Sequence, residues 1–344
     1  MLWTACYGLL VLAIEATNLA VLVGLLAGPL ATYYCLKHYA IQPCDPMSVT
    51  EVLGIDLEDK TGEDGAAMDI AQDNLVLKVI AHRFAGIDAP ENSLAALEAC
   101  FQRGCIAVEF DVVLTADGIP IVFHDNLLDR MTNTIGEVSK KTWDELSSLD
   151  ISINHPFHER FLGTNIPQFE DVIKKCLEYD MRLIIDIKDS SNEMTNIICK
   201  AYENYPMLYR RAIVTSFNPV VIYNIRSAKP GIIGAMSWRP YTMSCSNYSP
   251  KEEECVPYYS SFAAYYLARA ADLVNAWLFN NVSYYVVGIN LVLIHKDVIT
   301  PELVHRWKKR NIRVVAWTVN IPSEKMHFSR NLQIPYLTDT MTGD

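Results

Sequence analysis

The sequence predicts an α/β fold in which parallel strands alternate with helices packed outside them, most simply as a closed barrel. Short β-like runs alternate with helical patterns from about residue 75 to the end of the chain. The chain has 344 residues, of which 51% are hydrophobic and 20% charged, which suits one barrel of ordinary size with additions. An open doubly wound sheet is the alternative, but no G-x-G-x-x-G motif follows the first strand.

Strands and helices follow one another in a regular order. The predicted strands are Leu75–Ala81, Ile106–Leu114, Ile119–Phe123, Arg182–Lys188, Ala212–Ser216, Ile232–Met236, Val286–Leu293, Arg313–Thr318 and Tyr336–Thr338. The predicted helices are Ser93–Arg103, Phe169–Tyr179, Ser191–Tyr205, Pro219–Ala228 and Pro301–Arg310. A (β/α)8 barrel needs eight strands, so one of these nine predictions is wrong or belongs to an insertion.

The N-terminus predicts a membrane anchor. Up to Leu36 the only charged side chain is Glu15, and residues 16–36 alone reach the roughly 20 residues that cross a bilayer. A cleaved signal peptide is the alternative, because "LAGPLA" offers small residues. We therefore expect an anchor over residues 1–36, an acidic Gly-containing linker over 37–74, and the barrel domain over 75–344.

The segment 240–294 is an expected insertion, polar at its start and then apolar and rich in aromatic residues. A second transmembrane helix over Leu273–Ile294 is disfavoured, because its several Asn side chains would need partners in lipid. A span there would also separate the later strands from the earlier ones. We expect an amphipathic segment at the membrane surface, with a helical cap packed on the barrel as the alternative.

Overall composition excludes some classes of protein. The net charge of −11 argues against a nucleic-acid partner, which would need clustered Lys and Arg. The nine cysteines include no C-x-x-C pair and no cluster with zinc spacing. A small anionic ligand remains compatible with this charge, since a metal ion or a few basic groups create a local positive site.

Two strands carry carboxylates that predict a metal site. In "AVEFDVVL", Glu109 and Asp111 are two residues apart and so share one face of the strand, which points inward in a barrel. Because like charges repel there, a hard divalent cation is their natural partner. In "LIIDIKD", Asp186 and Lys188 also share a face. Asp186 is a candidate third ligand and Lys188 a phosphate contact, although a plain Asp–Lys ion pair is the better explanation of these two residues taken alone.

Two histidines and an arginine follow predicted strands. His124 comes directly after Ile119–Phe123, and His82 and Arg83 end the first strand, with Glu91 farther along the loop. Histidine titrates near neutral pH and suits acid/base catalysis, while arginine suits forked contacts to phosphate oxygens. Two histidines, an arginine and a carboxylate-bound cation are the parts needed to cleave a phosphodiester.

Five motifs in order, "AHRFAGIDAPENS", "VEFDV", "GIPIVFHD", "IIDIK" and "VVAWTVN", resemble the glycerophosphodiester phosphodiesterase family, and the apolar segments resemble its membrane-bound animal members. The resemblance implies a TIM barrel that uses a divalent cation, Mg²⁺ or else Ca²⁺. It implies cleavage of glycerophosphodiesters to glycerol 3-phosphate and an alcohol. The implied substrates include glycerophosphoinositol, glycerophospho-N-acylethanolamines and lysophospholipids, of which the lysophospholipids would give lysophosphatidate-type products. Location in the plasma membrane, endoplasmic reticulum or vesicles, contact with membrane lipid and a signalling-protein partner are also implied.

The motifs assign roles to residues by similarity. His82 and His124 match the catalytic pair, and Glu109, Asp111 and Asp186 match the metal ligands. Arg83, Glu91, Lys188 and Trp317 match positions that line the phosphate, metal and glycerol sites.

One departure concerns the residues after His-Arg, where the family has glycine and this chain has Phe84 and Ala85. Glycine there would permit positive φ or close approach to a phosphate, so Phe84 is expected to narrow or reshape the pocket. A phospholipase C-like barrel specific for phosphatidylinositol and a non-catalytic membrane scaffold are the alternative functions. The first leaves "WTVN" and "APEN" unexplained, and the second is disfavoured because no expected His or carboxylate is missing.

Overall fold

A computed structural model describes residues 27–28, 30–56, 76–251 and 254–342. The chain divides into two compact units, Met1–Ile41 and Gln42–Asp344. In the first unit, residues 30–39 are helical. Among the described residues, no helix is both long enough and apolar enough to cross a membrane. Most of the predicted anchor, residues 1–26 and 29, lies outside the described part of the chain.

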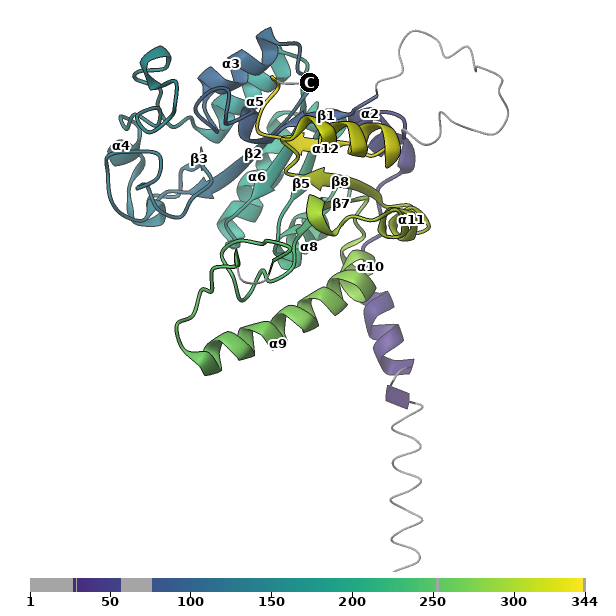
Figure 1. The fold of residues 1–344 in the computed structure, drawn as a ribbon. Coiled ribbons are helices and arrows are strands. Elements are labelled where there is room, and N and C mark those ends of the chain that lie inside the picture. Colours follow the sequence, from purple (N-terminus) through teal and green to yellow (C-terminus); the bar gives the residue numbers. More distant parts are fainter. Residues whose placement is uncertain (1–26, 29, 57–75, 252–253, 343–344) are drawn as a thin grey trace, which may run out of the picture. The chain divides into compact units, whose positions relative to one another are not determined.

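The second unit is a parallel barrel (Figure 1). Its strands are β1 (Val79–Ala81), β2 (Ala107–Leu114), β4 (Arg182–Ile187), β5 (Ala212–Thr215), β6 (Ala235–Trp238), β7 (Leu291–His295), β8 (Arg313–Trp317) and β9 (Tyr336–Thr338). They neighbour one another in chain order, and β9 pairs with β1. The barrel closes between β5 and β6, where Val214 forms a parallel bridge with Gly234 and its N–H donates to the Ile233 carbonyl at 3.0 Å. The predicted barrel is confirmed.

The surplus strand is β3 (Pro120–Val122), which pairs antiparallel with the outer half of β2. A turn at Thr115–Gly118, with Gly118 at φ 77°, reverses the chain between them. His124 therefore follows the returning strand of a hairpin, and β3 is the one of the nine predicted strands that does not belong to the barrel. The hairpin returns the chain to the level of Asp111, since the Phe123 N–H donates to the Asp111 carbonyl at 3.1 Å.

The five predicted helices form with ends shifted by a few residues. They are α3 (Leu94–Gln102), α5 (Phe169–Glu178), α6 (Asn192–Asn204), α8 (Pro219–Ala228) and α11 (Pro301–Lys308). Side chains of Ser93, Ser191, Asn218 and Thr300 cap four of them by accepting a hydrogen bond from a free N–H of the first turn. Three short helices, α4 (Trp143–Leu146), α7 (Leu208–Arg211) and α12 (Pro322–Met326), lie in the connections.

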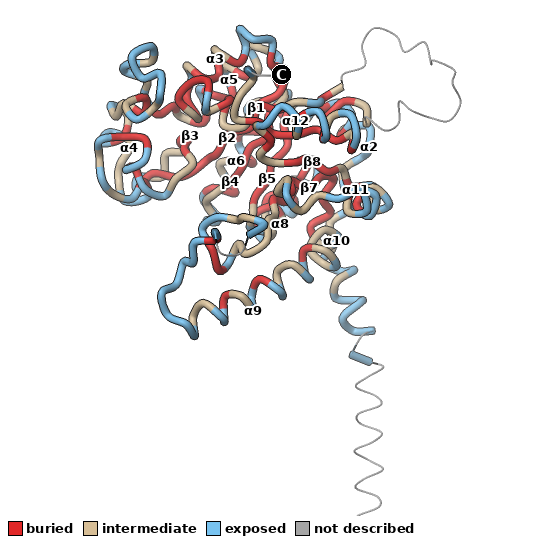
Figure 2. The backbone as a smooth tube through the Cα atoms, viewed as in Figure 1, coloured by how far each residue is buried: buried red, intermediate tan, exposed pale blue. Residues whose placement is uncertain are grey.

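The barrel interior is closed by a helix that the sequence analysis assigned to the linker. Residues of α2 (Pro46–Leu53) are buried among inward-facing strand residues such as Ile80, and Figure 2 shows how thoroughly these strands are buried. Asp45 caps α2 and Pro46 starts it, a combination typical of a helix N-terminus. This signal was overlooked because the segment 37–74 is acidic in composition. Residues 57–75, which include the rest of that segment, lie outside the described part of the chain.

The insertion forms one long helical arm before β7. It runs through α9 (Phe262–Leu278), a π-helical turn (Phe279–Ser283) and α10 (Tyr284–Val287). The predicted strand Val286–Leu293 starts only at Leu291, because Gly288 at φ 66° ends the helix first. Phe279 and Val287 pack into the core, whereas α9 buries only Ala268 and Asp272. The arm is thus a cap at its C-terminal end and an exposed helix elsewhere.

A buried arginine joins the root of this arm to the barrel. The Arg226 side chain of α8 is fully buried and donates to the carbonyls of Gln42, Pro230, Ile232, Val287 and Gly288. These acceptors belong to three separate stretches of chain. Each would lose its charged donor if the guanidinium were removed.

We therefore expect Arg226→Met to lower the free energy of unfolding by about 3 kcal/mol or more, since orphaned buried polar groups cost roughly 1–3 kcal/mol each. Urea denaturation measures the effect, with Arg306→Met on the exposed side of α11 as the control. A loss below about 1 kcal/mol would contradict a clamping role.

Candidate active site

The polar side chains that end the strands meet in a cavity of about 490 Å³ at the carboxyl ends of the barrel strands. Its wall includes seven of the nine predicted site residues: His82, Arg83, Glu109, His124, Asp186, Lys188 and Trp317. Asp111 is 1% exposed and lies beside Glu109 and Asp186 beneath this wall. Glu91 stands apart, against Arg83 and Arg130.

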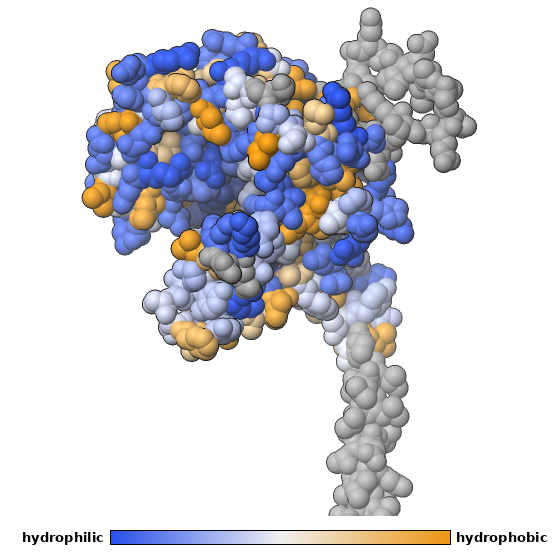
Figure 3. Space-filling model, viewed as in Figure 1, coloured by the Kyte–Doolittle hydropathy of each residue, from blue (hydrophilic) through white to orange (hydrophobic). Residues whose placement is uncertain are grey.

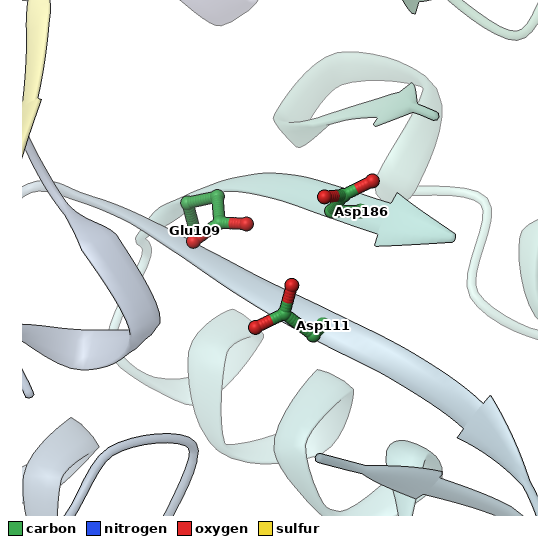
Figure 4. A group of neighbouring side chains, drawn as sticks. All are labelled: Glu109, Asp111 and Asp186. Atoms are coloured by element: carbon green, nitrogen blue, oxygen red, sulfur yellow. The ribbon is translucent and has the colours of Figure 1, made fainter. Parts of the chain in front are cut away.

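Three carboxylates converge on one point (Figure 4). Glu109 and Asp111 come from β2 and Asp186 from β4, and Asp111 and Asp186 are direct partners in the strand register. Each offers a ligand oxygen, and these oxygens lie within 4.8 Å of one another. The Asp186 Oδ1 atom is buried and has no hydrogen-bond partner in the described part of the chain. An all-oxygen donor set with an unsatisfied buried carboxylate atom fits a hard divalent cation.

Basic side chains partly neutralise the negative charge of this cluster. Lys188 Nζ lies 2.9 Å from Asp111 Oδ1 and 2.6 Å from Asp186 Oδ2, and Arg83 Nε lies 3.5 Å from Asp111 Oδ2. Although burial opposes it, Lys188, His124 and Arg83 hold the pKa of Asp111 well below its usual range. Burial, followed by repulsion from Asp111, raises the pKa of Glu109 to about 8. Of the two carboxylates on β2, Glu109 is therefore the one whose charge is less compensated by protein groups.

His82 is held by a carboxylate from the last strand. Its Nδ1 lies 2.5 Å from Asp339 Oδ1, while Asn320 donates to the other oxygen of Asp339 at 2.8 Å. Burial alone would lower the pKa of His82, but the charge of Glu109 and the hydrogen bond to Asp339 raise it overall. With Nδ1 occupied, Nε2 lies on the cluster side, 3.8 Å from Glu109.

His124 has an equivalent partner. Its Nδ1 lies 2.6 Å from Asp125 Oδ1, and Arg130 Nε donates to Asp125 Oδ2 at 2.5 Å. Arg130 also donates to both oxygens of Glu91. Glu91 therefore orients two arginines and is not a wall residue. Each histidine thus has an aspartate on Nδ1 that fixes the ring and leaves Nε2 for the cavity.

The backbone after His82 has the positive φ angles that glycine at these positions would permit. Arg83, Phe84 and Ala85 all have positive φ, at 49°, 64° and 60°. The Phe84 side chain is fully buried, packs on Phe110 at 5.4 Å between ring centres, and does not line the cavity. The expectation that Phe84 narrows or reshapes the pocket is wrong. The Phe84 ring fills the space under the loop. Its packing there stabilises a positive-φ backbone conformation that usually favours glycine.

Several site residues were missed from the sequence. Asp339 and His295 follow or end the barrel strands β9 and β7, and this position at a strand end was the available signal. Phe217, which directly follows the predicted strand Ala212–Ser216, gave the same signal. Tyr248 gives no such signal, because it lies on a loop that only the fold brings to the cavity. Arg130 is likewise placed by a loop that follows the β2–β3 hairpin.

Comparison with known proteins gives consistent matches. Residues 82–339 match the Glycerophosphoryl diester phosphodiesterase family. Glycerophosphodiester phosphodiesterase 1 of Homo sapiens is 32% identical over 268 residues, which cover 78% of this chain and 79% of the human protein. The Bos taurus protein of the same name is 33% identical over 278 residues, covering 81% and 82%.

Solved structures share the fold. An Oleispira antarctica phosphodiesterase in complex with the product sn-glycerol-3-phosphate aligns with a TM-score of 0.57 at 24% identity, covering 76% of this chain and 92% of that one. A glycerophosphodiester phosphodiesterase from Agrobacterium tumefaciens aligns with a TM-score of 0.57 at 20% identity, covering 77% and 96%.

Proposed function

This chain belongs to the glycerophosphoryl diester phosphodiesterase family and is a phosphoric diester hydrolase, and from that premise we propose that His82 and His124 cleave glycerophosphodiesters in the barrel cavity. One observation carries the proposal. Two histidines, each fixed through Nδ1 by an aspartate, share one cavity with a cluster of three carboxylates. Family membership sets aside the phospholipase C-like and scaffold interpretations.

The two imidazoles divide the proton transfers. One accepts at Nε2 the proton of the attacking hydroxyl, which is either the glycerol 2-hydroxyl or water. The other donates a proton from Nε2 to the leaving oxygen as its bond to phosphorus breaks. Asp339 and Asp125 stabilise whichever ring is cationic, and they keep both rings oriented between steps.

The negative charge on the phosphate would be neutralised by a bound cation and by basic side chains. Glu109, Asp111 and Asp186 would hold the divalent cation, Mg²⁺ by our proposal, and when bound it supplies Lewis-acid neutralisation of a phosphate oxygen. Arg83 and Lys188, both on the cavity wall, are proposed to contact the remaining phosphate oxygens. Trp317 is proposed to pack on the glycerol carbons.

The direct test is an assay of the full chain with glycerophosphoinositol, a glycerophospho-N-acylethanolamine and a 1-acyl lysophospholipid. Release in Mg²⁺ of glycerol 3-phosphate from the first two diesters, or of 1-acyl-glycerol 3-phosphate from the lysophospholipid, that stops with EDTA supports the proposal. Release that is unaffected by EDTA, or absent for all three diesters, contradicts it. The Oleispira antarctica protein, whose structure contains sn-glycerol-3-phosphate, supports this choice of product.

We also propose that the protein acts at a membrane, anchored through residues 1–36 ahead of a linker and the barrel unit. Exposed apolar side chains on α9 support this: Phe262 is 78% exposed, Leu267 74% and Leu273 75%. Figure 3 shows hydrophobic side chains at the N-terminal end of α9. An exposed apolar stripe that also carries Trp277 is typical of a helix lying in the headgroup region. The proposal includes location in the plasma membrane, the endoplasmic reticulum or vesicle membranes, and binding to a signalling-protein partner.

Replacing Leu267 and Leu273 together by Glu is expected to lower kcat/KM about tenfold or more on a glycerophospho-N-acylethanolamine in phosphatidylcholine vesicles, because roughly 1.5–3 kcal/mol of burial is lost per leucine. Activity on soluble glycerophosphoinositol should be unchanged. Val220→Glu, on the exposed face of α8, is the control. Equal losses on both substrates would refute interfacial docking of α9.

A further inference from the structure

Opposite the carboxylates, the cavity is walled by the ends of β7 and β8. In the closed order of eight strands, β7 lies four places from β2 in either direction, so it faces β2 across the barrel. His295 ends β7 and Trp317 ends β8, and the two residues are direct partners in the strand register. Both line the same cavity as Glu109 and Asp186.

Aromatic neighbours hold the His295 ring in place. Its Nδ1 accepts a hydrogen bond from the Asp297 N–H at 3.4 Å and lies 3.6 Å from Asp297 Oδ2. The hydrogen bond from the N–H favours the neutral tautomer with the proton on Nε2. The ring meets Tyr248 and Trp317 edge-on, with ring centres 4.9 and 5.0 Å away. Burial comes first among the influences on this ring and lowers the pKa of His295, which favours the neutral form. The result is a rigid N–H donor on the cavity wall.

Trp317 offers a second donor on this wall. Its Nε1 atom is buried and has no hydrogen-bond partner in the described part of the chain. Its ring is held edge-on by Phe217 on one side and His295 on the other. Buried donors without acceptors are uncommon in proteins, so a ligand oxygen is the expected partner. The nearby cations are already engaged, since Arg239 donates to backbone carbonyls of the insertion and Lys296 pairs with Asp297 and Glu324. The two neutral N–H donors among aromatic rings therefore suit a hydroxyl better than a second phosphate.

We propose that His295 and Trp317 form a hydroxyl-binding subsite for the free primary hydroxyl of the substrate's glycerol, with Nε2 of His295 donating to its oxygen. This inference rests on the proposed function, which places the phosphate at the β1–β2–β4 side. The glycerol is the constant part of these substrates, and a deep wall made by strand ends suits a constant group. The variable alcohol is left to the part of the cavity that Thr242 and Tyr258 of the insertion line.

A consequence concerns the class of substrate. An acyl group on the primary hydroxyl would have to occupy the space between His295, Trp317 and Tyr248. The subsite therefore favours diesters whose glycerol is unesterified, including glycerophosphoinositol and glycerophospho-N-acylethanolamines, over 1-acyl lysophospholipids. The acyl chain of an N-acylethanolamine is on the leaving alcohol and does not meet this wall.

The test compares sn-glycero-3-phosphoinositol with its 1-deoxy analogue, in which propane-1,2-diol replaces glycerol. The wild-type protein is expected to lose roughly 10- to 100-fold in kcat/KM on the analogue, the range set by leaving a donor unpaired. His295→Phe keeps an aromatic ring between Tyr248 and Trp317. It is expected to lose a similar factor on the parent substrate and to show no further loss on the analogue. His295→Gln, which retains an N–H donor, should recover part of the discrimination.

The controls separate this inference from the proposed function. His305→Phe, on the exposed face of α11, should behave as wild type with both substrates. Calorimetric binding of sn-glycerol 3-phosphate and of propane-1,2-diol phosphate tests the subsite even if no diester is turned over. Wild-type protein that treats the two ligands alike, or folded His295→Phe that discriminates as strongly as wild type, would overturn the subsite. Absence of turnover with preserved discrimination in binding would overturn only the proposed function.

Discussion

Glu109→Gln is expected to lower phosphodiester turnover about a thousandfold or more while leaving the metal-free protein at least as stable as wild type. The loss of turnover follows because one of three clustered oxygen ligands is replaced by a neutral amide, and metal ions supply several kcal/mol of transition-state stabilisation. The variant is expected to keep its stability because the buried carboxylates repel one another when no cation is bound, and the substitution removes one of them. Glutamine resembles the protonated form that the raised pKa of Glu109, about 8, favours without a cation.

The same substitution should flatten the dependence of metal-free stability on pH. The pKa of Glu109 is 4.5 in the unfolded chain and about 8 in the folded one, so the folded state binds the proton more tightly. Wild-type stability in EDTA therefore falls as pH rises from about 4.5 to 8, and Glu109→Gln removes that contribution. His82, whose pKa the same carboxylate helps to raise, contributes stability that is also lost with rising pH.

Thermal unfolding in EDTA and in Mg²⁺ across pH 5 to 8 measures both effects. Wild-type protein should gain in Tm on adding Mg²⁺, most strongly near pH 8, and Glu109→Gln should gain little. Glu178→Gln, on the exposed side of α5, is the matched control. A variant that is strongly destabilised in EDTA, or that keeps full turnover, would show that Glu109 is a structural residue and not a ligand.

The parts of the site that could be predicted from sequence share one physical basis. Glu109, Asp111 and Asp186 were found because strand residues two apart share a face, and the carboxyl ends of parallel strands meet at one rim. Local periodicity and strand direction are enough to place such a residue on the barrel wall, without any knowledge of its neighbours.

What sequence could not supply was contact between distant elements. Asp339 becomes the partner of His82 only because β9 pairs with β1 across 257 positions of sequence. The direction of β3 was missed because a short apolar run looks alike in parallel and antiparallel pairs. Phe84 was expected in the pocket because sequence shows its backbone requirement but not which way its ring points. The role of each histidine likewise depends on where substrate atoms lie.

That division of roles is open to experiment, since His82→Gln and His124→Gln are each expected to lower kcat by roughly 10²- to 10⁴-fold on glycerophosphoinositol. The two losses should differ in origin. Removing the group that protonates the leaving oxygen matters only if that oxygen needs a proton. Removing the group that accepts a proton from the nucleophile matters for every leaving group.

A glycerophospho-p-nitrophenyl diester separates the two, because p-nitrophenolate leaves without a proton. One of the two variants, and not both, should regain most of its activity on this substrate, which identifies the missing group as the general acid. His158→Gln, an exposed histidine outside the cavity, should leave both substrates unaffected. Equal rescue of both variants, or of neither, would argue that the rings do not share acid and base roles. Since Asp339 and Asp125 hold His82 and His124 in similar ways, the protein contacts alone favour neither assignment, and the leaving group has to decide it.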